Sequence, residues 1–185
     1  MTNLRKNALM NAKKQITVFC REARRMGALD AVVVSPAKVF TATWVRLRCQ
    51  YGCSGFGQCL TCPPNSPAPE TTRQMLDEYR KAILLHGNHW KSLREITQTL
   101  ESKIFLAGYY KAFAFLCGPC DLCTTCAIQK KGGKIAACVH PELARPAMEA
   151  AGIDVFATAR AAGLPIEVVD STDCPPNYYT LILVE

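Results

Sequence analysis

The 185-residue chain contains eleven cysteines, and nine of them gather in two short segments that limit how the chain can fold. The first segment is Cys49-x3-Cys53-x5-Cys59-x2-Cys62, and the second is Cys117-x2-Cys120-x2-Cys123-x2-Cys126, followed by Cys138. An odd number of cysteines argues against a complete disulfide framework. Residues 1–14 are polar and basic, without the apolar stretch of a signal peptide. We therefore expect a cytoplasmic protein whose reduced thiols bind metal.

The composition is that of a globular protein, with 49% hydrophobic and 20% charged residues. No apolar run reaches the roughly 20 residues that a membrane span requires, so we expect no membrane association. The length predicts a single metal-binding domain over residues 1–185, with cysteine-rich loops at about 49–69 and 117–141.

Hydrophobic periodicity predicts both helices and strands. We expect helices over residues 7–26, 70–81, 88–107 and 154–163, with Asn88 and Asp154 as caps. We expect strands over 31–34, 39–47, 82–85, 166–169 and 179–184, whereas 109–116 fits either state. This order predicts an α/β or α+β fold, in which helices flank a mixed β-sheet beside the two cysteine-rich loops.

The second cysteine segment is typical of a [4Fe–4S] site. A C-x2-C-x2-C run surrounds a cubane closely, and the fourth ligand comes from farther along the chain. We predict that Cys120, Cys123, Cys126 and Cys138 are the ligands, which leaves Cys117 as a packed residue or a substitute ligand. Zinc is the alternative, because all-cysteine zinc sites also use C-x2-C pairs.

The first segment is compatible with several kinds of metal site. Its glycines allow the backbone to pass close to a metal. Cys49, Cys53, Cys59 and Cys62 are suited to a second cluster or to zinc, and three of them could hold a cluster with one open iron. A crossed arrangement is also possible, in which Cys62 or Cys174 completes the other cluster.

The remaining charged and cysteine residues have simpler interpretations. The formal charge of +7 can balance anionic clusters. The rival interpretation is a nucleic-acid surface, which is less favoured because no aromatic residues interleave the basic ones. Cys20 lies on the apolar face of its helix and is expected in the core. His86 and His89 are expected at the surface or as caps, and Arg145 and Glu149 are expected to pair along a helix.

Several runs resemble a prokaryotic family of predicted metal-binding proteins, domain of unknown function 2284. They are the following: Cys53-x-Gly55-Phe56-Gly57-x4-Cys62-Pro63-Pro64, Gly108-Tyr109-Tyr110-Lys111-Ala112, Gly118-Pro119-Cys120-x2-Cys123-x2-Cys126, and Cys138-x-His140-Pro141-x3-Arg145-Pro146-x-Met148-Glu149-Ala150-x-Gly152-Ile153-Asp154-Val155. The resemblance covers about residues 49–169 and implies metal binding. Cys59 and Cys117 stand where this family usually lacks cysteine. The resemblance therefore implies a set of three, Cys49, Cys53 and Cys62, with Cys59 a possible fourth ligand.

Three functions follow as hypotheses. The first is an iron–sulfur protein with one or two [4Fe–4S] clusters, which transfers electrons to a redox partner protein or supports a redox enzyme. The second is an enzyme whose open iron binds a small-molecule substrate as a Lewis acid or sulfur carrier. The third is an interaction or assembly module stapled by zinc.

Overall fold

The structure is a computed structural model, and it describes residues 16–130, 132, 136–171 and 173–185. Residues 16–25 form a helix that ends at Gly27, where φ is 112°; the part of the predicted helix before residue 16 lies outside the described residues. The elements that follow are β1 (Asp30–Val34), η1 (Pro36–Lys38), α2 (Thr43–Gly52), α3 (Pro69–Asp77), β2 (Ala82–Gly87), α4 (Trp90–Leu106), β3 (Phe113–Phe115), α5 (Ala127–Lys130), η2 (Glu149–Ala151), α6 (Val155–Ala161) and β4 (Tyr178–Leu183).

The four strands form one sheet in the order β1-β2-β4-β3. All three ladders are antiparallel, with Val32 opposite Leu84 and Leu84 opposite Leu181. The α+β prediction is therefore confirmed, but the strands do not form the mixed sheet that we expected. A parallel bridge joins Leu116 to Ala147, outside these strands.

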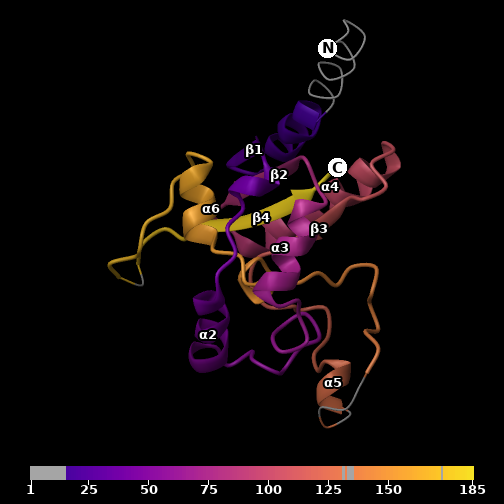
Figure 1. Cartoon of the computed structure of the whole chain (residues 1–185), viewed down its shortest axis with the longest axis vertical. Coiled ribbons are helices and arrows are strands. Elements are labelled where there is room, and N and C mark those ends of the chain that lie inside the picture. Colours follow the sequence, from indigo (N-terminus) through magenta and orange to yellow (C-terminus); the bar gives the residue numbers. More distant parts are fainter. Residues whose placement is uncertain (1–15, 131, 133–135, 172) are drawn as a thin grey trace, which may run out of the picture.

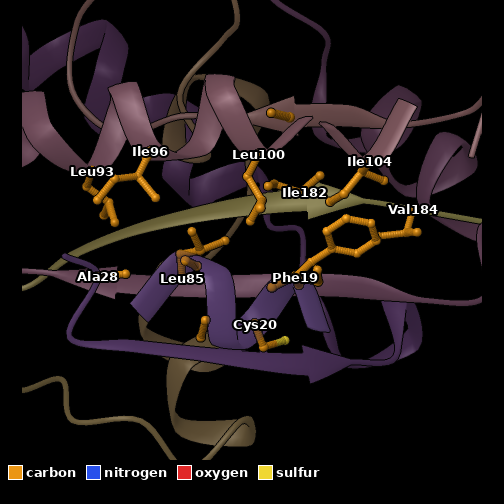
Figure 2. Close-up of a cluster of buried hydrophobic side chains, with 14 of the residues drawn as sticks. Phe19, Cys20, Ala28, Leu85, Leu93, Ile96, Leu100, Ile104, Ile182 and Val184 are labelled. Atoms are coloured by element: carbon orange, nitrogen blue, oxygen red, sulfur yellow. The ribbon is translucent and has the colours of Figure 1, made fainter. Parts of the chain in front are cut away.

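One face of the sheet is covered by α4 and the helix over residues 16–25. Leu93, Ile96, Leu100 and Ile104 recur every three or four residues, and Figure 2 shows them projecting from α4 toward the strands. Cys20 is 6% exposed in the same cluster, so its predicted core position is confirmed. This spacing places one side of the helix in the core because an α-helix turns once every 3.6 residues.

The other face packs against α3, η2 and α6. Leu76, Met148 and Ala159 are fully buried there against strand residues such as Leu84. Asp154 caps α6 as predicted, because its Oδ1 accepts a hydrogen bond of 2.9 Å from the Ala157 N–H.

The strand predicted over residues 39–47 is wrong from Thr43 onward. Phe40 and Ala42 are extended, because Asp154 N–H donates to the Phe40 carbonyl (2.8 Å) and Ala42 N–H donates to that of Gly152 (2.9 Å). Helix α2 then begins, and it buries Val45. The alternating apolar residues suggested a strand, but tertiary hydrogen bonds hold only the first part in extended form.

Three further expectations are corrected. Residues 166–169 form no strand, and Val168 is 72% exposed. His89 rather than Asn88 caps α4, because its ring nitrogen accepts from the Ser92 N–H (3.3 Å). His86 is buried, since it lies on the central strand β2 and stacks on Tyr179.

The cysteine-bearing segments lie together beside the sheet. In Figure 1, α2 and α5 extend below the strands with their adjoining loops, away from the helix over residues 16–25. Across the described part of the chain, no helix combines the length and the apolar character needed to cross a membrane.

Candidate metal centre

The first cysteine segment begins on a helix, although we predicted a loop from residue 49. Cys49 lies in the last turn of α2 and Cys53 is its C-cap, whereas Cys59 and Cys62 lie in the turns that follow. Gly57 adopts a φ of 73° and donates its N–H to the Pro63 carbonyl (2.7 Å), which closes the turn. The helix therefore fixes the start of the segment, and the glycine turn returns the chain toward it.

Arg46 fastens this segment to the domain. Its guanidinium donates to the carbonyls of Pro64 (3.3 Å), Ser66 (3.2 Å), Pro67 (2.9 Å) and Ala150 (3.1 Å). These acceptors belong to the end of the cysteine segment and to η2, so one cation joins α2, the loop and η2. A guanidinium suits this role because its several N–H donors diverge in a rigid fork.

The second segment leaves the sheet directly after β3. Leu116 accepts a hydrogen bond from Met148 N–H and donates to the Pro146 carbonyl, both at 2.8 Å. Cys117 follows in the core with 2% exposure, and its thiol donates to the Trp90 carbonyl (3.7 Å). Cys120, Cys123 and Cys126 then lie in the loop before α5, each half-buried.

Arg94 has the same role for the second segment that Arg46 has for the first. It projects from α4 with 4% exposure and donates to the carbonyls of Cys117 (3.2 Å) and Pro119 (2.7 Å). It also pairs with Asp121 (3.3 Å) and lies over the Trp90 ring. The backbone from residue 117 to 121 is therefore held by a buried cation as it enters the cysteine run.

The two cysteine segments meet. The Gln129 side-chain amide donates to the carbonyl of Gln58 (2.9 Å) and to its side-chain oxygen (3.0 Å). Thiols from both segments are also close enough to affect one another's pKa. The charges of Cys120 and Cys126 raise the pKa of Cys59, and the charge of Cys120 raises that of Cys62. Segments almost sixty residues apart thus share one cysteine-rich region.

Burial and mutual repulsion oppose ionisation of these thiols. The pKa of Cys59 is raised to about 12, mainly by burial and in addition by the neighbouring Cys62, Cys126 and Cys120. Burial also raises the pKa of Cys123, with added effects from Cys120, Cys126 and Cys138. Crowded thiolates are unfavourable without a counter-charge, and a bound metal ion supplies that charge.

The predicted ligands fall into two neighbouring groups. Cys123 interacts with Cys120, Cys126 and Cys138, while Cys49 interacts with Cys53 and Cys62. Within the described ranges, no three Cys, His, Asp or Glu side chains are already arranged to hold a metal ion. The thiols are thus neighbours without being preformed ligand sets.

Cys174 has a different environment. Its thiol lies 3.7 Å from the Ser171 hydroxyl, and hydrogen bonds with Ser171 and the Asp170 backbone lower its pKa. All eleven cysteines are free thiols in the structure.

A hollow of about 890 Å³ opens beside the first segment. It lies between α2, the start of α6 and residues 166–169 and 176–177, and both Cys49 and Cys53 line it. Trp44, Val168 and Val169 contribute apolar walls and are about half exposed or more. Its volume lies within the range of roughly 300–1,000 Å³ that small-molecule sites occupy.

Residues 32–184 match the family described as predicted metal-binding protein (DUF2284). This match covers well over half of the chain. The chain belongs to this family. No curated protein and no solved structure matched the chain.

The side chains present fit the metal that the DUF2284 family is predicted to bind. The two adjoining segments offer up to nine sulfur donors, and soft thiolates select zinc, copper(I) and iron–sulfur clusters over hard cations. Among the described residues, the cations that act on these thiols are Arg46 near Cys49, Arg94 near Cys117 and Lys130 near Cys123, fewer than the thiols themselves. A thiophilic metal is therefore the natural counter-charge for this region.

Sequence reasoning missed two features of the centre. Arg94 was not singled out, although an arginine on the apolar side of a predicted helix is a detectable signal of a buried anchoring role. The expected pair of Arg145 and Glu149 is wrong, because Arg145 pairs with Glu101 (3.0 Å). Residues 145–148 are not helical, so the four-residue spacing does not bring the two side chains together.

Proposed function

We propose that this protein is a cytoplasmic [4Fe–4S] protein that transfers electrons to a redox partner protein or supports a redox enzyme. The observation that supports the proposal best is the meeting of two cysteine segments whose thiols raise one another's pKa. Cys120, Cys123, Cys126 and Cys138 would hold the first cluster. A second metal would be bound by Cys49, Cys53 and Cys62, with Cys59 as a possible fourth ligand.

The protein's own residues would stabilise the bound form. Arg46 and Arg94 hold the backbone of the two segments and place positive charge near the thiolates. Backbone N–H groups contribute too, as when Gly55 donates to the Cys53 sulfur (3.4 Å). A [4Fe–4S] cluster, when bound, supplies a one-electron carrier whose potential depends on such hydrogen bonds and on solvent exposure.

Anaerobic purification tests this proposal, followed by iron, zinc and sulfide analysis and by EPR of the reduced protein. We expect comparable amounts of iron and sulfide, a brown colour and an EPR signal near g = 2. A colourless protein that contains zinc and no sulfide would reject the iron–sulfur proposal and favour the zinc-stapled module.

A second candidate is an enzyme with an open iron at the Cys49, Cys53 and Cys62 site. The hollow beside Cys49 and Cys53 favours it, because a buried electron carrier needs no cavity of ligand size. The assay is conversion of a [3Fe–4S] form to a [4Fe–4S] form on addition of iron, followed by EPR. Four-cysteine ligation of every cluster would argue against an open site.

A further inference from the structure

His86 is a buried titratable side chain that the metal centre does not use. Its side chain is 5% exposed, and the antiparallel register places it on β2 between Asp30 of β1 and Tyr179 of β4. Residues directly opposite one another on adjacent strands share one face of the sheet. The three side chains therefore form a row across three strands, on the face that packs against α3, η2 and α6.

One ring nitrogen of His86 is already paired. Nε2 lies 2.7 Å from the side-chain oxygen of Asn177, which can only accept, so Nε2 carries the hydrogen and donates it. Asn177 directly precedes β4 and lines the hollow beside the first cysteine segment. The buried ring thus ties one wall of the hollow to the centre of the sheet.

The other ring nitrogen has no hydrogen bond. In the described part of the chain, Nδ1 of His86 is the one buried side-chain nitrogen or oxygen that lacks such a partner. It lies 3.8 Å from Oδ2 of Asp30, which is too long for a hydrogen bond but close enough for an ion pair once the ring is charged. Because Nε2 holds the hydrogen of the neutral ring, Nδ1 then turns a lone pair toward a carboxylate, and two acceptors cannot pair. Protonation of Nδ1 removes this mismatch.

The groups around the ring leave it as the one whose charge can change near neutral pH. Asp30 pairs through Oδ1 with Arg24 (3.5 Å), so its carboxylate joins that helix to the histidine. The pKa of Tyr179 is raised to about 12, by burial first and then by Asp30, so the stacked phenol stays neutral. Asn177 carries no charge, and Arg160 of α6 is half exposed and pairs with a surface glutamate.

We propose that His86 is a proton-sensitive latch. Uptake of a proton from solvent at Nδ1 pairs the ring with Asp30 and strengthens its hydrogen bond to Asn177, so the wall of the hollow is held more firmly below neutral pH. Histidine suits this role because its charge ordinarily changes between pH 5 and 8. A charged donor forms a hydrogen bond about twice as strong as a neutral one. The added hold is present while the ring is charged and is lost as rising pH removes the proton.

The first measurement uses the native full chain, with its three histidines labelled with ¹⁵N. NMR of the ring nitrogens distinguishes a neutral imidazole from a doubly protonated one. We expect His86 to carry one hydrogen, at Nε2, at about pH 8 and two hydrogens at about pH 6. His89, the exposed cap of α4, is the reference in the same spectrum. A His86 ring with a single hydrogen at both pH values would overturn the proposal.

The second measurement shows whether the proton strengthens the hold on the wall. Asn177→Ala is compared with the native protein by chemical denaturation at both pH values. We expect the substitution to raise the unfolding equilibrium constant roughly fivefold more at the lower pH, because it then removes a charged hydrogen bond. This extra effect should disappear in an Asp30→Asn background, where the ring lacks its counter-charge. The matched control is Glu167→Gln, since Glu167 lines the same hollow but is 86% exposed at its side chain, and its effect should be equal at both pH values.

Two denaturation results would overturn the latch even if the His86 ring gains its second hydrogen. An equal effect of Asn177→Ala at both pH values would mean that the proton does not reach the wall. Persistence of the extra effect in Asp30→Asn would mean that the ring is charged without the proposed partner. If Asp30→Asn does not fold, the native spectrum and Asn177→Ala decide the proposal between them. Neither measurement depends on which metal the cysteines bind.

Discussion

Replacing Arg94 with Met should loosen the start of the second cysteine segment. The change keeps an unbranched apolar stem in the core but removes the donors to the Cys117 and Pro119 carbonyls. Hydrogen bonds from a charged group contribute about 1.5–3 kcal/mol each. Removing the guanidinium also removes the cost of burying it, which offsets part of that loss.

We therefore expect the apoprotein to lose about 3 kcal/mol of unfolding free energy. In a chain of this size, that loss corresponds to a fall of about 6–12 °C in the melting temperature. Asp121 adds little to this value, because its side chain is 43% exposed and water can replace the arginine.

The assay is thermal unfolding of the chelator-treated protein by circular dichroism, with iron retention measured in parallel. Lys91→Met is the matched control, because Lys91 also lies over Trp90 (5.4 Å) on the same helix but is exposed. It should lose less than about 1 kcal/mol. Arg94→Lys should fall between the two, since it keeps the charge but not the fork. Equal stability of Arg94→Met and Lys91→Met would refute the anchoring role.

Four other substitutions, at three places in the fold, give separate expectations. Arg46→Met should lower the free energy of unfolding by about 2–4 kcal/mol, because it removes charged donors to four carbonyls at a half-buried site. Limited proteolysis should then cleave the segment over residues 53–66 faster than in the native protein. Cys120→Ser should abolish iron binding at the second segment. Cys117→Ala should keep the iron but lose about 1–2 kcal/mol of stability, since Cys117 packs in the core. Equal loss of iron in both variants would contradict this choice of ligands. Gly152→Ala should lower the free energy of unfolding by about 2 kcal/mol or more in chemical denaturation, because the new methyl group meets Pro69 and the φ of 76° is strained for alanine. An unchanged denaturation midpoint would contradict this prediction.

Local sequence patterns predicted most of the regular elements. The apolar spacing of Leu93, Ile96, Leu100 and Ile104 predicted α4, and the buried run from Ala82 predicted β2. Both patterns lie within a single helix or strand, so the sequence of that stretch alone is enough to predict the element. The prediction failed at α2, where alternating apolar residues suggested that the strand continued beyond the part that distant hydrogen bonds hold extended.

The chain's cysteine count and spacing were enough to indicate thiol-based metal binding, because a ligand's chemistry belongs to the residue itself. Only the tertiary structure decided that Cys59 and Cys62 lie near Cys120, that Arg94 supports the second segment, and that Arg145 pairs with Glu101 rather than with Glu149. These neighbours lie about 23 to 61 residues apart. Their meeting depends on how helices pack on a shared sheet, which no local period encodes.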